Sequence, residues 1–173
     1  GRRWGLELES TIPMDWLGLN TARLDIKARW QDSSVTDPVT GKKRVLSSVG
    51  RLSSRLPYND IDVKYFAVIN FRQDFEAQRV AWGWELTERA ERPLFKVNEL
   101  DVFNEGIILN LFVETTRWLG LKIHLGVKDI LNQQKVRERT IYTGERALTA
   151  VSRVEITDVT RGRQLEIFFS GSF

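Results

Sequence analysis

The chain has 173 residues, of which 42% are hydrophobic and 28% charged, which is the composition of a folded protein rather than of a disordered one. It has no cysteine, which excludes disulfide bonds, thiol catalysis and thiolate metal sites, and its one histidine, His124, excludes mechanisms that need two imidazoles. The 26 basic and 23 acidic residues give a net charge of +3, too small an excess to indicate a nucleic-acid partner. No apolar run approaches the roughly 18 to 20 residues of a membrane-spanning helix.

Apolar and polar residues alternate along most of the chain with a period of two. In the clearest example, Thr21 to Gln31, every even-numbered residue is apolar and every odd-numbered one is polar or charged. Such periodicity is typical of β-strands with one apolar face, and no segment combines helix caps with a 3.6-residue apolar stripe. The pattern therefore predicts an all-β protein of seven antiparallel strands. Six joins separate these strands: Pro13–Asn20, Asp32–Asp60, Asp74–Gln78, Glu88–Glu105, Arg117–Gly120 and Ile130–Gly162.

The joins alternate between short and long. Transmembrane β-barrels have short periplasmic turns and long external loops, and their tilted strands cross the bilayer with about nine to eleven residues. We therefore predict an up-and-down transmembrane β-barrel segment of about seven or eight strands. The eighth strand depends on Phe95–Phe103, which either extends the fifth strand outward or forms a hairpin with it through Asn104-Glu105-Gly106. A soluble antiparallel β-sandwich has the same alternation and remains an alternative.

Tryptophans are predicted at both ends of the apolar strands. Trp16 and Trp118 lie in two short joins with the same Trp-Leu-Gly-Leu sequence, and Trp30 and Trp84 lie toward the opposite ends of their strands. Because indole rings favour the headgroup level of a bilayer, we predict that these four residues belong to the two aromatic girdles of a membrane barrel. In a soluble protein the same rings would pack beneath the sheet.

The last predicted strand runs to the end of the sequence and closes on Phe173, with Phe169 four residues before it. Bacterial outer-membrane barrels end in a strand with a terminal aromatic residue. The strand here resembles the signal by which the assembly machinery recognises such barrels. We therefore expect Phe169 and Phe173 to act as an assembly signal.

Three internal segments and this final strand resemble the C-terminal portion of TonB-dependent outer-membrane receptors. The segments are Asp37–Gly41 in the first long join, Phe71–Phe75 before a short turn, and Val127–Asn132 before the last long join. The resemblance spans most of the chain.

The resemblance implies a location in the bacterial outer membrane and TonB-energised uptake of a scarce nutrient, such as a siderophore or a carbohydrate. Residues 1–173 would form a single C-terminal segment of a 22-stranded barrel, with the plug domain outside this chain. The implied partners are the upstream barrel strands and plug of the same receptor, TonB through the plug, the barrel assembly machinery, outer-membrane lipid and lipopolysaccharide. Seven strands fit a segment, because an odd number leaves the two ends on opposite sides of the membrane and an even-numbered barrel then needs further strands.

Charged residues on the predicted lumen face are the candidates for contact with a transported ligand. They are Arg23, Lys27, Arg29, Arg72, Arg79, Lys122 and His124. Arg161 and Arg163, where the last strand would enter the outer leaflet, either bind lipopolysaccharide phosphates or are simply solvated. Asp32 and Asp37 either hold a hard cation or, as is commoner, cap turns, and we predict no metal site.

No catalytic motif stands out in the sequence. There is neither a Gly-rich phosphate loop nor a Gly-x-Ser-x-Gly elbow, and a Ser-His-Asp triad would have to use His124, on the predicted lumen face. We therefore expect no enzymatic activity and no cofactor. The alternative is a small complete outer-membrane barrel of eight strands with lipid-directed activity that depends on His124.

Overall fold

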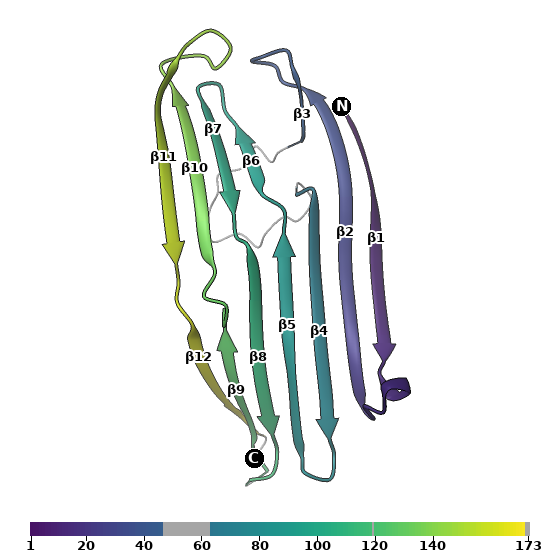
Figure 1. Ribbon diagram of the computed structural model, residues 1–173. Coiled ribbons are helices and arrows are strands. Elements are labelled where there is room, and N and C mark those ends of the chain that lie inside the picture. Colours follow the sequence, from purple (N-terminus) through teal and green to yellow (C-terminus); the bar gives the residue numbers. More distant parts are fainter. Residues whose placement is uncertain (47–62, 119, 172–173) are drawn as a thin grey trace.

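The computed structural model describes residues 1–46, 63–118 and 120–171, and it is an antiparallel all-β fold (Figure 1). Its one described helix is η1 (Asp15–Leu17), a single 3-10 turn, so no described helix is long or apolar enough to span a membrane. The described strands are β1 (Arg2–Pro13), β2 (Ala22–Thr36), β3 (Lys43–Arg44), β4 (Tyr65–Phe75), β5 (Val80–Arg89), β6 (Arg92–Phe95), β7 (Glu99–Asn104), β8 (Ile107–Thr115), β9 (Lys122–Lys128), β10 (Gln134–Tyr142), β11 (Val151–Thr160) and β12 (Gln164–Ser170).

The long strands form one sheet in the order β1-β2-β4-β5-β8-β9-β12, and each neighbouring pair is antiparallel. A second sheet, β11-β10-β7-β6, lies beyond the first, and its strands continue β12, β9, β8 and β5 respectively (Figure 1). The described strands form an open sheet with β1 and β12 at its edges. The three short connections gather at one end, which we call the turn end, and β3 and the outer hairpins lie at the other, the hairpin end.

The pairing register explains why alternation in the sequence becomes a two-faced sheet. Directly opposite residues in an antiparallel pair point to the same face, so apolar positions must meet apolar positions across every pair. One row runs from Ile26 through Ile69 and Leu86 to Leu109, and the adjacent polar row runs through Asn70. A slip of one residue in any strand would place its apolar side chains among charges, and this penalty specifies the register.

The structure contains the seven strands and three short turns expected from the sequence, but all three long joins contain further strands, which gives twelve described strands instead of seven or eight. The added strands are β3 in the first long join, β6 and β7 in the second, and β10 and β11 in the third. Pro93 and the short length of β6 concealed one hairpin, and both faces of β10 and β11 carry charges, which obscured their alternation. Glu99–Asn104 does extend the fifth strand, β8, outward as β7. The chain makes no hairpin at Asn104-Glu105-Gly106 but passes from β7 into β8. It reverses direction between β6 and β7, in the turn from Phe95 to Glu99, so Phe95 belongs to β6 and not to the extension.

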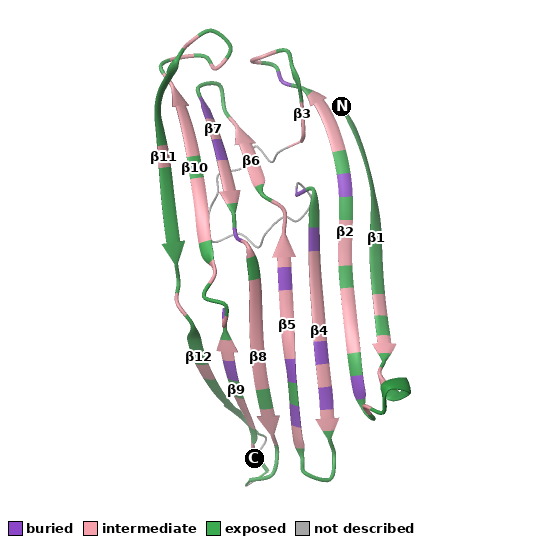
Figure 2. Cartoon of the chain, viewed as in Figure 1, coloured by how far each residue is buried: buried purple, intermediate pink, exposed green. Residues whose placement is uncertain are grey.

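Only a small set of the described apolar residues is buried, and it lies on or next to β2, β4 and β5. Figure 2 shows buried residues mainly along β2, β4 and β5, whereas β1, β11 and β12 are exposed along most of their length. The buried hydrophobic residues among those described are Ala22, Val63, Phe66, Phe71 and Ala81. A single curved layer of this kind gains most of its order from backbone pairing and from side chains packed along rows, rather than from a core between two layers.

Gly83 is a position where the packing admits no side chain. A Cβ atom there would lie 2.1 Å from the Phe71 carbonyl oxygen and 2.7 Å from Cζ of Phe112, whose ring covers the glycine. Gly83→Ala should therefore lower the free energy of unfolding by about 1–3 kcal/mol, measured by urea denaturation of the full-length protein. Gly144→Ala is the control, because its Cβ would meet only the Thr149 side chain, which can move aside. Equal unfolding midpoints for the two variants would contradict the close packing at Gly83.

Candidate functional site

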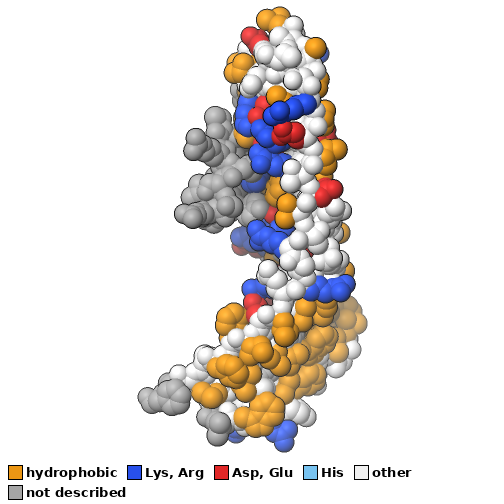
Figure 3. Space-filling view, turned by 90° about the vertical axis from the view of Figure 1, so that its left-hand side faces the viewer, with side chains coloured by type: hydrophobic (Ala, Val, Ile, Leu, Met, Phe, Trp, Pro, Cys, Tyr) orange, Lys and Arg blue, Asp and Glu red, His pale blue; other side chains and the backbone are white. Residues whose placement is uncertain are grey.

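The seven-stranded sheet has one face that is apolar across its whole width. Its rows align from β1 to β12 by direct cross-strand pairing, and no described strand packs over it. Leu165 is 73% and Phe169 67% exposed, whereas Phe71, in mid-sheet, is buried beside the rings of Trp82 and Trp84. Figure 3, seen from the β11–β12 edge, shows hydrophobic side chains gathered over the turn-end half and charged side chains above them. The face includes Leu6, Leu8, Ile26, Trp30, Ile69, Phe71, Trp84, Leu86, Leu109, Leu111, Val113, Leu125, Val127, Leu165, Ile167 and Phe169.

Aromatic rings border this apolar face at both ends. Toward the hairpin end, Trp30 lies directly opposite Tyr65 and makes an edge-on contact with Trp4 at 4.9 Å between ring centroids. At the turn end, Trp16 and Trp118 are both exposed, each in a turn whose glycine has a positive φ, 76° at Gly18 and 67° at Gly120. Glycine adopts this left-handed conformation freely, which explains why each of the two Trp-Leu-Gly-Leu sequences carries a glycine at this position.

Trp84 does not lie where its girdle role requires. It sits in the middle of β5, opposite Phe71 and stacked on that ring at 5.9 Å, so it lies six residues along β4 from the row of Trp30 and Tyr65. The sequence predicts Trp84 near the outer end of its strand because it predicts that the strand ends before Glu88. The strand continues to Arg89, so Trp84 lies at its middle. Phe169 lies on the apolar face opposite Ile123, while Phe173 falls outside the described residues.

The opposite face is charged, and the structure places six of the seven ligand candidates on it. Each of these six side chains contacts at least one carboxylate, so this part of the face presents paired charges rather than a positive surface. The seventh candidate, Arg79, is not on this face, because it lies in the exposed turn between β4 and β5. The pairs are Arg23–Asp25 (3.3 Å), Lys27–Glu9 (2.5 Å), Arg29–Glu7 (3.2 Å), Arg72–Asp74 (2.8 Å), Arg72–Glu114 (2.9 Å), Lys122–Glu114 (2.8 Å) and His124–Glu114 (3.1 Å).

Glu114 connects three of these candidates, and the sequence analysis did not single it out. Its carboxylate contacts Arg72, Lys122 and Nδ1 of His124, and with Arg79 these residues line or adjoin a cavity of about 390 Å³ at the turn end. The strict alternation of β8 does place Glu114 on the polar face, so its position was predictable. Its partners were not, because they come from β4 and β9.

His124 stands between two carboxylates and two aromatic rings. Nδ1 faces Glu114 at 3.1 Å and Nε2 faces Glu166 at 3.7 Å. Its ring stacks on Phe112 at 5.6 Å and leans against Phe168 at 5.8 Å. These contacts position the imidazole as one member of a charged network on the polar face.

At the hairpin end the charged face continues as a cluster of buried ion pairs, which we call the outer cluster: Glu99, Asp101, Arg137 and Arg139. Asp101 is fully buried and accepts two hydrogen bonds from Arg137, at 2.9 and 2.7 Å. Arg139 donates to Glu99 at 2.7 Å, and this hydrogen bond outweighs burial and holds the pKa of Glu99 at about 2.

Asp37 caps a turn and binds arginines, and its oxygens are not available to a cation. Burial would raise its pKa, but hydrogen bonds from Arg146 and from the backbone N–H groups of Val39 and Thr40 lower the pKa to about 2. Within the described ranges, no group of three or more His, Asp or Glu side chains is arranged to hold a metal ion. Asp32 lies apart from Asp37, on the wall of a second cavity.

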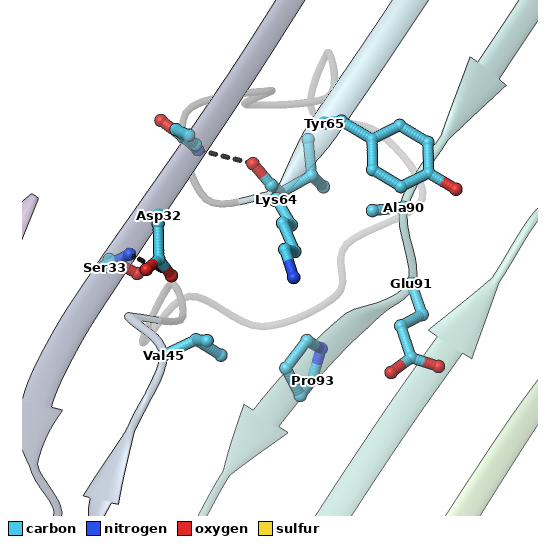
Figure 4. A pocket seen from close by; sticks show the side chains of 10 residues that line it. Asp32, Ser33, Val45, Lys64, Tyr65, Ala90, Glu91 and Pro93 are labelled. Atoms are coloured by element: carbon cyan, nitrogen blue, oxygen red, sulfur yellow. Dashed lines mark hydrogen bonds between the residues drawn. The ribbon is translucent and has the colours of Figure 1, made fainter. Parts of the chain in front are cut away.

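This outer cavity of about 350 Å³ lies beyond the end of β4 (Figure 4). Asp32 and Ser33 of β2 form one wall, Glu91 and Pro93 the opposite one, and the amine of Lys64 is directed into the space between them. The predicted lipid-contacting arginines lie elsewhere: both are exposed before β12, and Arg163 donates to the carbonyl of Ile130 at 2.8 Å.

Comparisons of the chain with protein-family models, with curated proteins and with solved structures found no match. A functional assignment therefore depends on the chemistry of the two faces and on the sequence.

Replacing Glu114 tests whether it organises the polar face. Glu114→Gln should lower the free energy of unfolding by about 1–3 kcal/mol, because Arg72, Lys122 and His124 lose a shared carboxylate in a half-buried place. Glu76→Gln, in the exposed β4–β5 turn, should change it by less than about 0.5 kcal/mol. Both values come from urea denaturation near neutral pH. A Glu114→Gln protein as stable as Glu76→Gln would show that the contacts to Glu114 contribute little.

The lowered pKa of Glu99 predicts a pH-dependent contribution to stability. Because its folded-state pKa, about 2, lies below its ordinary value of 4.5, the stabilisation is complete above about pH 4.5 and is lost as the pH falls toward 2. Glu99→Gln should be clearly less stable than the native protein at pH 6, and the difference should shrink as the pH approaches 2. The free energy of unfolding of both proteins across this range provides the measurement, and a difference independent of pH would refute the ionised, paired state.

Proposed function

We propose that this chain forms part of the wall of a transmembrane β-barrel in the bacterial outer membrane, within a receptor of the TonB-dependent kind that imports a scarce nutrient. The observation that carries the proposal is the apolar, uncovered face of a seven-stranded antiparallel sheet opposite a face of paired charges. Lipid would contact the first face, and the second would line the lumen.

The height of the apolar face suits a bilayer. On β4 the apolar side chains run from Tyr65 at the hairpin end to Phe75 at the turn end. Ten residue steps cover about 33 Å along a strand, which becomes about 25 Å along the membrane normal at a tilt of roughly 40°. Outer-membrane barrels have an apolar band of about this height, bordered by aromatic residues.

The aromatic residues also lie at the two heights that correspond to the membrane–water interfaces. Trp4, Trp30 and Tyr65 would lie at the outer interface, and Trp16 and Trp118 at the inner one, with the exposed indole rings at the headgroup level. The short turns would face the periplasm and the hairpin end the exterior. A Trp84 in mid-strand would contact acyl chains.

The polar face fits contact with a polar plug and with a hydrated ligand path. Four of its cations, Lys27, Arg29, Arg72 and Lys122, are already paired with carboxylates of other strands, so it offers both donors and acceptors without a large charge of either sign. Such a surface suits contact with a plug and a passing ligand inside the lumen better than it suits a chemical reaction. We therefore propose no enzymatic activity and no cofactor. TonB would act through the plug.

The soluble β-sandwich would need a second layer packed on the apolar face. Among the described residues no strand covers that face, and the second sheet continues the first rather than stacking on it. A small complete barrel would need a pairing of β12 with β1. These two strands run in the same direction in the described sheet, so direct antiparallel closure between them is not possible.

A pair of adjacent substitutions on β4 tests the proposal. Ile69→Arg places a charge in the middle of the apolar face, where lipid contact should cost about 2–4 kcal/mol, while Asn70→Arg places the same charge on the polar face one residue later. In fractionated cells the native protein and Asn70→Arg should be recovered from detergent-extracted outer membrane, and Ile69→Arg should be strongly depleted there.

The cell fraction that contains the native protein distinguishes the membrane barrel from the soluble β-sandwich. Native protein found without detergent in the soluble fraction would overturn the membrane proposal and favour the sandwich. Equal outer-membrane recovery of Ile69→Arg and Asn70→Arg would show that the apolar face does not contact lipid.

A further inference from the structure

Three segments that are far apart in the sequence meet at the hairpin end. They are the β2–β3 hairpin with Asp37, the β6–β7 hairpin with Phe95, and the β10–β11 loop with Arg146. Asp37 and Arg146 are 109 residues apart, yet Nη2 of Arg146 donates to Oδ2 of Asp37 at 2.7 Å. This contact links the two margins of the outer region that Figure 1 shows leaning toward each other.

The Asp37 carboxylate is completely occupied by donors from two of these segments. It is 2% exposed, and besides Arg146 it accepts from Nε of Arg44 at 3.0 Å and from the backbone N–H of Val39 at 2.8 Å and of Thr40 at 3.3 Å. A buried carboxylate with four donors is strongly held, and removing one charged partner would leave the other charge buried without compensation.

Arg146 reaches the third segment as well. Its Nε donates to the Lys96 carbonyl at 2.5 Å and its backbone N–H to the Val97 carbonyl at 2.9 Å, both at the tip of the β6–β7 hairpin. The Phe95 ring lies between the two arginines, 4.5 Å from the Arg44 guanidinium and 5.6 Å from that of Arg146.

Side-chain contacts connect the β2–β3 hairpin to the β6–β7 hairpin, where the described backbone forms no strand pairing. In the described strands β3 pairs only with β2, and no backbone ladder joins it to β6. The outer cavity lies in the gap between β3 and β6, with Val45, next to Arg44, on one wall and Pro93, two residues before Phe95, on the other. The spacing of those walls therefore depends on discrete polar contacts that can break as a unit.

From this geometry we infer that Asp37, Arg44, Arg146 and Phe95 form an outer latch. The latch holds the β2–β3 hairpin, the β6–β7 hairpin and the β10–β11 loop together, and the gap between β3 and β6 widens only when the Asp37–Arg146 pair separates. The inference concerns the hairpin end alone and does not depend on placement in a membrane.

Hydrogen exchange on the full-length protein tests the latch. Asp37→Asn removes the charge from one hairpin, and the decisive readout is the distant β10–β11 loop, where the amides of Tyr142 and Arg146 donate to the β6–β7 tip. Exchange of peptides covering residues 142–149 should become at least about tenfold faster, as expected for loss of a coupling of about 1.4 kcal/mol. Asp158→Asn, on exposed β11, is the matched control and should leave these rates unchanged.

The reciprocal variant makes the test independent of folding defects in Asp37→Asn. Arg146→Lys retains the charge but loses the forked contacts, and it should accelerate exchange in residues 36–44 of the β2–β3 hairpin. The double variant Asp37→Asn/Arg146→Lys should exchange no faster than the quicker single variant, because the same latch is lost once. Acceleration confined to the mutated segment in each single variant, or additive effects in the double variant, would overturn the inference.

Discussion

Strict register across seven antiparallel strands is the constraint on which the rest of the structure depends. The strands of the main sheet alternate, and in the middle of the sheet the register places apolar residues opposite apolar ones, as in the row Ile26, Ile69, Leu86 and Leu109. A strand shifted by one residue would place its apolar side chains on the charged face and its charges on the apolar face. Irregular backbone is correspondingly kept out of the main sheet. The positive φ angles of Gly106, Asp129, Asn132 and Gly162 occur where the main strands pass into their outer continuations.

These irregular points divide the molecule into two regions with different sources of order. In the main sheet, side chains pack along rows, and the charged face is satisfied by pairs between neighbouring strands. In the outer region β10 and β11 carry charges on both faces, and ion pairs connect neighbouring strands, such as the pair of partly exposed Arg137 with buried Asp101. A surface facing lipid and a surface facing water-filled or polypeptide-filled space would explain why apolar rows stop at the level of Trp30 and Tyr65.

The pairing of charges changes how the polar face is interpreted. From the sequence, Lys27, Arg29 and Arg72 are candidates for contact with a transported ligand, because they lie on the predicted lumen face. In the structure Lys27 and Arg29 pair with carboxylates of the adjacent strand β1, and Arg72 pairs with Asp74 of its own strand and reaches across β5 to Glu114 of β8. The charges of this face therefore offset one another, and its hydrogen-bonding groups include both donors and acceptors. Glu114 of β8 is important for the same reason, since its one carboxylate contacts three side chains from two other strands, β4 and β9.

Alternation by itself determined the strand class, the seven main strands, the two faces and the positions of the short turns, because a period of two is a local property that each strand carries alone. It also placed His124 and Glu114 on the polar face. Only the tertiary structure decided which charges neutralise one another, that Trp84 lies in mid-strand, and that Asp37 meets Arg146, since these depend on register and on contacts between residues as many as 109 positions apart. No local pattern in a sequence encodes such distances.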